Sequence, residues 1–233
     1  MIRTNPITRR EALTLVAVTA AGGALMSRTT FAQEAGASAT ELITGADVCV
    51  ITPQVTEGPY YFDPALERAD ITEGRPGLPT TVRLQVVDST CKPISSARVD
   101  IWHADATGLY SGYSQPGGVS TEGETFMRGT WFTDDSGVVA FQTVYPGWYR
   151  GRTTHIHFKV FLDQANVLTG QLFFPDEISN QVYSTVVPYN KRGEERDTFN
   201  DGDRIAQQAT SASVATVEEG SDGYLAQLIV GVA

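Results

Sequence analysis

Short segments in which apolar and polar residues alternate, separated by turns, run through the middle of the sequence and limit what it can fold into. TTVRLQVV and SARVDIW each place their apolar residues on one face of an extended strand, with a bend at Lys92 and Pro93 between them. TWFT and VVAFQTV repeat the scheme around Asp135, Ser136 and Gly137, residues that suit a tight turn. We therefore expect two strand-turn-strand units, each paired as a hairpin.

The rest of the chain continues mainly as strands. A further strand is expected from about residue 153 to residue 162, and GYLAQLIVGV would form the last one. Residues 188–202 are polar and are interpreted as a loop, and the 22 Gly and 11 Pro favour strands and loops over long helices. Because strands follow one another without a regular alternation with helices, the sequence predicts an all-β fold with an antiparallel β-sandwich core.

The first 32 residues have the composition of an export signal. The adjacent Arg9 and Arg10 precede the apolar run LTLVAVTAAGGALM, and small residues follow up to Ala32. A transmembrane anchor is the alternative, but the run is shorter than the ~20 apolar residues that a bilayer requires. We expect residues 1–32 to be a twin-arginine signal, residues 33–45 a linker and residues 46–233 one domain. The protein would then work in the periplasm or outside the cell, without a stable membrane anchor.

Charge and cysteine content narrow the choice of partners. The formal net charge of −10 disfavours binding to nucleic acid or to anionic lipid, whereas a homo-oligomer is compatible with the sequence. Cys49 and Cys91 are the two cysteines, and in an exported chain we expect them to form one disulfide; two buried free thiols are the alternative. Neither CxxC nor Cys/His finger spacing occurs, which excludes a zinc knuckle.

Two of the three histidines occur together in the segment THIHFKVFL. Residues two apart in a strand point to the same side, so Ile156, Phe158 and Val160 would face the core. His155 and His157 would then project together from the opposite face, with their Cα atoms about 6.6 Å apart. Two imidazoles at this separation can bind one metal ion, although two solvated histidines on a half-exposed strand are the alternative.

The type of metal depends on the remaining ligands. A facial triad of two histidines and one carboxylate, typical of Fe(II), would need Asp105 or Asp163, and neither is marked by its spacing. Phenolate oxygens are harder donors that favour Fe(III), and the candidates are Tyr110 and Tyr149. A zinc hydrolase that uses the histidines with a carboxylate, and a secreted binding protein without iron, are the other functions that we consider.

Five segments occur in a fixed order between about residues 49 and 200. They are TEGPYY (56–61), VDIWHADATGLY (99–110), TDDSGVVAFQTVYPGWY (133–149), RTTHIHFKV (152–160) and LTGQLFF (168–174). Together they resemble the intradiol ring-cleavage dioxygenases, the family of the catechol and protocatechuate 3,4-dioxygenases, and most of all its exported single-chain members. The resemblance implies a β-sandwich with long active-site loops and one non-haem Fe(III) per chain. Its partners would be a small catechol substrate and O2, with ring opening between the two hydroxylated carbons to a muconate-type diacid.

The resemblance also implies roles for single residues. The metal ligands would be Tyr110, Tyr149, His155 and His157. Tyr110 would also act in catalysis by giving way to the substrate, and Arg152 would supply fixed positive charge. Gln171 would line the substrate pocket, and Tyr60 and Tyr61 would either face the substrate or fix the N-terminal segment to the sandwich.

Two further residues have competing interpretations, and one feature departs from the family. Tyr145 is a rival ligand to Tyr149, its alternative role being to pack beneath the loop, and His103 is expected to be structural. The link from Tyr149 to His155 is shorter than in the catechol and protocatechuate enzymes, so part of their pocket wall has no counterpart in this chain.

Overall fold

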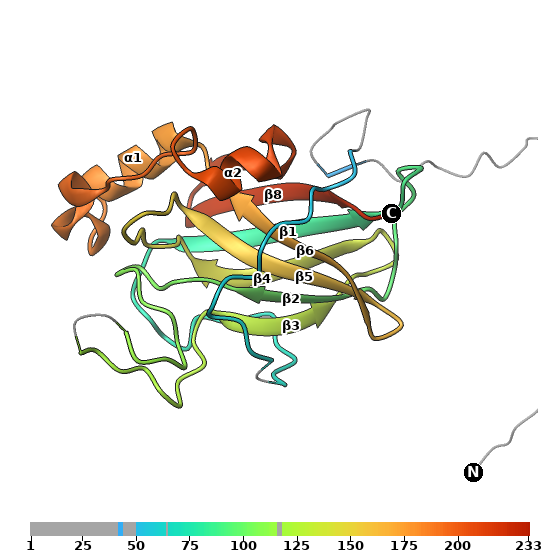
Figure 1. Cartoon of the computed structure of the whole chain (residues 1–233), viewed down its shortest axis with the longest axis horizontal. Coiled ribbons are helices and arrows are strands. Elements are labelled where there is room, and N and C mark those ends of the chain that lie inside the picture. The colour runs from blue at the N-terminus through green and yellow to red at the C-terminus, as the bar shows by residue number, and fades with distance from the viewer. Residues whose placement is uncertain (1–41, 44–49, 64, 116–117) are drawn as a thin grey trace, which may run out of the picture. The chain divides into compact units, whose positions relative to one another are not determined.

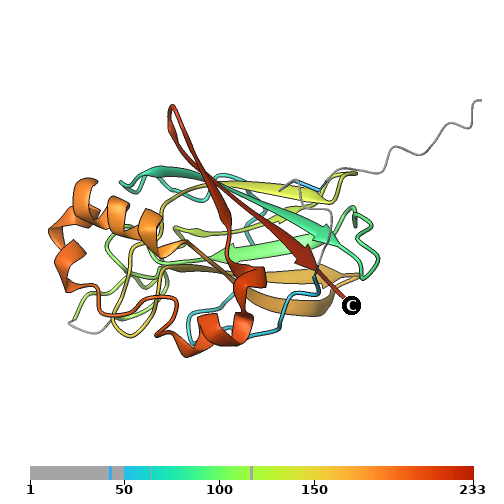
Figure 2. The same ribbon diagram turned by 90° about the horizontal axis from the view of Figure 1, so that it is seen from above.

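The computed structural model describes residues 42–43, 50–63, 65–115 and 118–233. Within them the chain forms a sandwich of two four-stranded sheets, which confirms the predicted all-β fold (Figures 1 and 2). The predicted export signal, residues 1–32, lies outside the described residues, as does most of the predicted linker, residues 33–45. The described part contains no helix that is both long and apolar enough to span a membrane.

The first sheet has the strand order β4-β1-β8-β7. Its strands are β1 (Pro79–Val87), β4 (Val138–Val144), β7 (Thr216–Gly220) and β8 (Gly223–Gly231). β1 pairs antiparallel with β4 but parallel with β8, so this sheet is mixed. A parallel neighbour requires a long connection, and the alternation of residues within one strand gives no sign of such a distant partner.

The second sheet has the order β3-β2-β5-β6, and all its pairs are antiparallel. Its strands are β2 (Arg98–Trp102), β3 (Arg128–Phe132), β5 (His155–Leu162) and β6 (Ala165–Phe173). The register places Trp102 opposite His157 on one side and Gln171 opposite it on the other. Directly opposed residues share a face of the sheet, so these three side chains are neighbours.

The two predicted hairpins are wrong, although the predicted strands are present. β1 and β2 belong to different sheets, and so do β3 and β4. In the second case Asp134 accepts hydrogen bonds from the backbone N–H groups of Ser136 and Val138, and Gly137 takes a φ of +73°. The turn therefore carries the chain from one sheet to the other. Alternation determines which face a strand buries, but it does not determine which strand lies beside it.

The apolar faces of the two sheets pack against each other to form the core. The strands supply Val82, Leu84, Val86, Val99, Ile101, Val139, Phe141, Ile156, Phe158, Val160, Ala226, Leu228 and Val230, all buried. Burying an aliphatic or aromatic side chain of this size contributes about 1.5–3 kcal/mol. The core thus fixes the position and rotation of β5, as its alternating residues predict.

β5 is buried on its second face as well. His155 and His157 are only 3% and 2% exposed, so the half-exposed strand considered above is wrong. The N-terminal segment, residues 50–63, covers this face: the N–H of Val55 donates to the carbonyl of Thr169 on β6, and Figure 1 shows the segment in blue crossing β6 and β5. The histidines therefore lie under a layer of chain.

Helical elements follow β6 and occupy one side of the sandwich (Figure 1). They are α1 (Asp176–Thr185), the 3₁₀ turns η1 (Tyr189–Lys191) and η2 (Gly193–Glu195), α2 (Arg204–Ala209) and η3 (Ser211–Ser213). The segment 188–202, interpreted from sequence as a loop, thus contains η1 and η2. Asp203 caps α2 by accepting from the N–H groups of Ile205 and Ala206.

Candidate metal centre

Four predicted metal ligands converge on one point. The Nε2 atom of His155 lies 3.0 Å from Tyr149 Oη, 3.1 Å from His157 Nε2 and 3.4 Å from Tyr110 Oη. The two phenol oxygens are 3.4 Å apart. The donors therefore come from three parts of the chain: the β2–β3 connection, the β4–β5 connection and the start of β5.

The two loops that carry the tyrosines are held together by glycines. The N–H of Gly147 donates to the carbonyl of Asp105 at 3.0 Å. A Cβ atom at Gly147 would lie 2.4 Å from that same oxygen, and one at Gly108 would lie 2.3 Å from the carbonyl oxygen of Trp148. Only residues without a side chain permit this approach, which brings the two phenols into reach of each other.

The donor atoms fit a bound cation. His155 Nδ1 lies 2.6 Å from the carbonyl of Thr153, to which it donates, so the Nε2 atom of this ring carries the lone pair. One lone pair cannot satisfy two phenols, a second imidazole and the guanidinium of Arg152, whose Nη1 is 3.3 Å away. A metal ion with bonds of about 2.0–2.2 Å holds neighbouring donors roughly 2.9–3.5 Å apart, the range found here.

The donor set is not one of carboxylates. The described residues contain no group of three or more His, Cys, Asp or Glu side chains that could hold a metal ion. Asp105 accepts from the N–H groups of Thr107 and Leu109 and so shapes the loop before Tyr110. Asp163 lies in the turn after β5, at the end of the strand away from the histidines. A facial triad with either carboxylate is therefore not formed.

Burial shifts the pKa of each donor. Burial and the neighbouring Arg152 lower the pKa of His155 to about 3, and burial and His155 lower the pKa of His157 far below its ordinary value. Burial and the neighbouring Tyr149 raise the pKa of Tyr110 well above 10; burial also raises the pKa of Tyr149, against the opposing effect of Arg152. Both imidazoles are thus neutral and able to bind a metal, whereas the phenols ionise only with help from a nearby cation.

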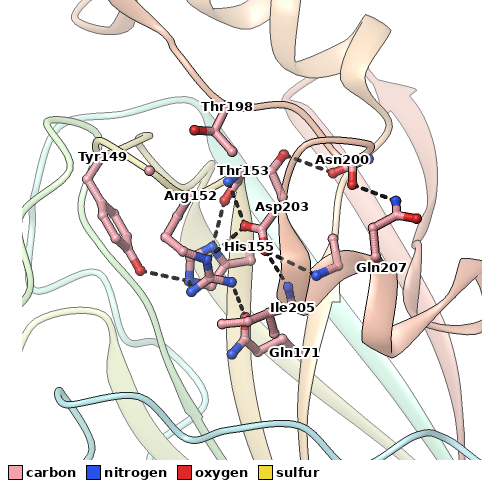
Figure 3. Close-up of polar contacts among 12 residues, drawn as sticks. Tyr149, Arg152, Thr153, His155, Gln171, Thr198, Asn200, Asp203, Ile205 and Gln207 are labelled. Carbon is pink, nitrogen blue, oxygen red and sulfur yellow. Dashed lines mark hydrogen bonds and ion pairs between the residues drawn. The ribbon is translucent and has the colours of Figure 1, made fainter.

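Arg152 is fixed beside the donors by partners on both sides (Figure 3). Its Nε donates to Asp203 Oδ2 at 2.7 Å, and its Nη2 donates to Gln171 Oε1 at 2.5 Å. Asp203 Oδ2 also accepts from the N–H of Thr153 at 2.9 Å. Asp203 is 2% exposed, so the ion pair is largely shielded from water and the guanidinium has one preferred orientation.

A cavity of about 910 Å³ opens in front of the two phenols. Tyr60 and Arg152 both line it, and the ring of Tyr60 stacks on that of Tyr110 with centroids 4.4 Å apart. Gln171, predicted to line the pocket, is fully buried; it accepts from Arg152 and donates to the carbonyl of Thr56. Its bond to Arg152 connects it to the cavity wall.

Tyr61 contacts the outer face of the second sheet. Its hydroxyl donates to Asp100 Oδ2 at 2.9 Å, and the ammonium group of Lys159 lies 3.7 Å from its ring centroid. It is absent from the cavity wall formed by the described residues. Of the two interpretations, the structure supports fixation of the N-terminal segment to the outer face of the sheet.

Tyr145 and His103 have structural surroundings. Tyr145 is fully buried among aromatic rings, and its hydroxyl lies 2.8 Å from Ser179 Oγ, so it is not a member of the donor set. His103 is held at Nδ1 by the carbonyl of Ala104 and at Nε2 by Thr143 Oγ1. Cys91 is disulfide-bonded, and Cys49, its predicted partner, lies outside the described residues.

Two residues near the site were missed by sequence reasoning. Asp203 could have been noticed as an N-cap, since Asp precedes the short helical segment RIAQQA, but its pairing with Arg152 is a tertiary contact. Arg192, which lines the cavity from the end of η1, lies in a polar segment with no motif. Nothing in the sequence marks this residue.

Comparisons with known proteins agree with this geometry. The family model described as "Dioxygenase" matches residues 56–188. The catechol 1,2-dioxygenase of Acinetobacter baylyi is 30% identical over 145 residues, which are 52% of this chain and 45% of that protein. The protocatechuate 3,4-dioxygenase beta chain of Burkholderia cepacia is 30% identical over 129 residues, 52% and 54% of the respective chains. The chain thus spans about half the length of these curated relatives.

A solved structure covers more of the chain. The intradiol ring-cleavage dioxygenase from Tetranychus urticae is 34% identical, with a TM-score of 0.73, over 79% of this chain and 95% of that one. The likeness therefore extends over most of both chains.

Proposed function

Because the chain belongs to the intradiol ring-cleavage dioxygenase family, we propose that it is a non-haem Fe(III) enzyme that cleaves catechol-type diols. O2 would open the ring between the two hydroxylated carbons and give a muconate-type diacid. One observation carries the proposal: two phenol oxygens and two imidazole nitrogens meet at separations of 3.0–3.4 Å beside a cavity.

The donor set suits a trivalent ion. Tyr110 and Tyr149 as phenolates would offset two of its three charges, and His155 and His157 would bind as neutral ligands. When bound, ferric iron would acidify the two hydroxyls of a catechol and withdraw electron density from its ring, so that the ring becomes reactive toward O2. The zinc hydrolase considered from the sequence would instead use a carboxylate beside the two histidines, and no described Asp or Glu completes such a donor set.

Arg152 provides fixed positive charge next to the reacting ring. Its position is determined before the substrate arrives, by Asp203 on one side and Gln171 on the other. A preorganised charge stabilises the electron-rich form of the ring without the cost of reorienting solvent. The same guanidinium lines the cavity, so it can contact the substrate directly.

Tyr110 provides a proton acceptor. Tyr110 lines the cavity, and we assign to its hydroxyl oxygen the uptake of one proton from a substrate hydroxyl. Tyr60 stacks on the ring of Tyr110 at 4.4 Å, which keeps the phenol in place when it changes partners. Catechol and O2 together contain all the atoms of muconic acid, so the reaction consumes no NADH or flavin.

We also propose that residues 1–32 direct the protein through the twin-arginine route to the periplasm or the medium. An enzyme that needs no reduced nicotinamide is suited to these compartments. Replacing Arg9 and Arg10 with Lys should retain the protein in the cytoplasm, as measured by cell fractionation. An unchanged distribution would contradict this assignment without affecting the proposed chemistry.

The proposed function is tested by iron content, colour and oxygen uptake. The ferric protein should contain one iron per chain and absorb visible light through tyrosinate-to-iron charge transfer. Catechol added under nitrogen should shift this absorption to longer wavelength, and in air it should consume one O2 per ring. Tyr149→Phe should weaken the absorption, whereas Tyr113→Phe should not, because the hydroxyl of Tyr113 donates to the carbonyl of Tyr61 away from the donors.

One result would sink the proposal. If protein supplied with ferric salt bound no iron, stayed colourless and left catechol intact, the four donor atoms would not form a ferric site and the proposed function would be wrong.

A further inference from the structure

The cavity beside the donor atoms is large for a single ring. Its volume of about 910 Å³ is near the upper end of the ~300–1,000 Å³ that holds drug-sized ligands. Catechol has only eight non-hydrogen atoms. Pro59, Tyr60, Leu109 and Ile205 provide apolar wall that could bury more than the diol ring. The substrate therefore has room for a substituent.

The charge of the cavity wall is opposite to that of the protein. The whole chain has 27 acidic and 17 basic residues. Among the described residues, Arg150, Arg152 and Arg192 line the cavity, and no Asp or Glu does. A concave, partly apolar wall strengthens the attraction of such cations for an anion, because less water screens them.

The three arginines differ in how far their charge is already neutralised. Arg152 is paired with the buried Asp203 at 2.7 Å. Arg150 is 83% exposed in its side chain and lies 3.7 Å from Asp197, a weak and screened contact. Arg192 forms no ion pair with any described side chain: its guanidinium lies 4.4 Å from the ring centroid of Trp148 and donates to the carbonyl of Thr107. Its charge is thus available to a ligand.

We propose that this cavity selects catechols that carry an anionic substituent, such as a carboxylate on a short arm, and that Arg192 is its principal partner. The inference rests on the proposed function, since the diol end of the molecule must occupy the donor atoms. The arm then extends along the apolar wall toward the mouth. A guanidinium there binds a carboxylate through charge-assisted hydrogen bonds, and Arg150 adds long-range attraction.

The test compares compounds of nearly equal size and different charge. The acid 3-(3,4-dihydroxyphenyl)propanoate carries a carboxylate, its primary amide is neutral, and dopamine is a cation. Oxygen uptake gives kcat/KM for each compound on the iron-loaded enzyme, and calorimetry under nitrogen gives Kd. We expect kcat/KM for the acid to exceed that for the amide by about five- to tenfold, and that for dopamine to be the lowest.

Variants assign the preference to Arg192. Arg192→Gln should reduce the acid-to-amide ratio to about one to two, whereas Arg192→Lys should retain part of it, because the charge remains but the planar guanidinium is lost. Arg83→Gln is the matched control; Arg83 lies on β1 and donates to Gln227 on β8, outside the cavity wall. If Arg192 had only a structural role, its substitution would lower kcat/KM for the acid and the amide by the same factor and leave their ratio unchanged.

The outcomes separate this inference from the proposed function. An acid-to-amide ratio near one in the wild type, or a ratio that survives Arg192→Gln, overturns the inference while the cleavage of catechols stands. If none of the compounds were oxidised, the proposed function would fail, and the ratio of Kd values would still decide whether the cavity prefers the anion.

Discussion

Replacing Asp203 with Asn should loosen Arg152 and lower both stability and turnover. One oxygen of Asp203 accepts from Arg152 Nε at 2.7 Å and the N–H of Thr153 at 2.9 Å; the other accepts from the N–H groups of Ile205 and Ala206. An amide offers one oxygen, so it must abandon either the guanidinium or the cap of α2. Losing the cap costs about 1 kcal/mol, and losing a hydrogen bond to a charged group costs about 1.5–3 kcal/mol.

We therefore expect Asp203→Asn to lower the free energy of unfolding by about 2 kcal/mol, measured by urea denaturation. kcat should fall by about tenfold, because Arg152 would no longer hold one orientation beside the ring. Asp201→Asn is the matched control, since Asp201 is exposed and undergoes the same chemical change. A surface substitution of this kind stays within about 0.5 kcal/mol.

The pH dependence gives a second measure. Burial raises the pKa of Asp203, but hydrogen bonds from Thr153 and Arg152 outweigh it, so the pKa is lowered on folding. A lowered pKa adds stability above the unfolded value of about 3.9, and this stability is lost as the pH falls through the folded value. The difference between wild type and Asp203→Asn should therefore shrink from pH 7 to pH 3. A constant difference, or an unchanged kcat at pH 7, would refute the reasoning.

Three further substitutions test single contacts. Arg152→Ala should leave iron and colour in place but lower kcat by about 10²-fold, measured by oxygen uptake; full turnover would remove Arg152 from the mechanism. Gly147→Ala puts a methyl group 2.4 Å from the Asp105 carbonyl oxygen. It should lower the free energy of unfolding by about 1–3 kcal/mol and weaken iron binding. Gly202→Ala, with no contact nearer than 3.7 Å, is its control in denaturation and iron titration. Tyr145→Phe should lower the free energy of unfolding by about 1 kcal/mol, measured by urea denaturation, and leave the visible absorption unchanged. A loss of colour would indicate that Tyr145 is a metal ligand.

The sequence predicted which face of each strand is buried better than it predicted which strands lie side by side. The alternation in β5 correctly separated Ile156 and Phe158 from His155 and His157, because the side-chain period of a strand is a local property. The pairing of β1 with β4 and β8 could not be read from the same pattern, since pairing depends on where a distant segment packs. The expected hairpins failed for this reason.

In the candidate site, too, residues marked by a local motif were predicted, and contacts between distant segments were not. Motif resemblance selected Tyr110, Tyr149, His155 and His157, and the structure brings their donor atoms together. The positions of Tyr61 and Gln171 were not predictable, because each depends on which partner competes for its polar group. Tyr61 bonds to Asp100, and Gln171 bonds to Arg152.

Alternate residues of β5 belong to two different interiors of the molecule. Phe158, in the core, is the direct chain neighbour of His157, in the candidate metal centre. A change in core packing that rotates this strand would displace a proposed metal ligand, so the colour expected of the iron-loaded protein would report how well the two sheets fit together. Arg192 lies on the helical side and shares no strand with the core. Substrate preference is therefore free to diverge among relatives while the proposed iron site and the fold stay the same.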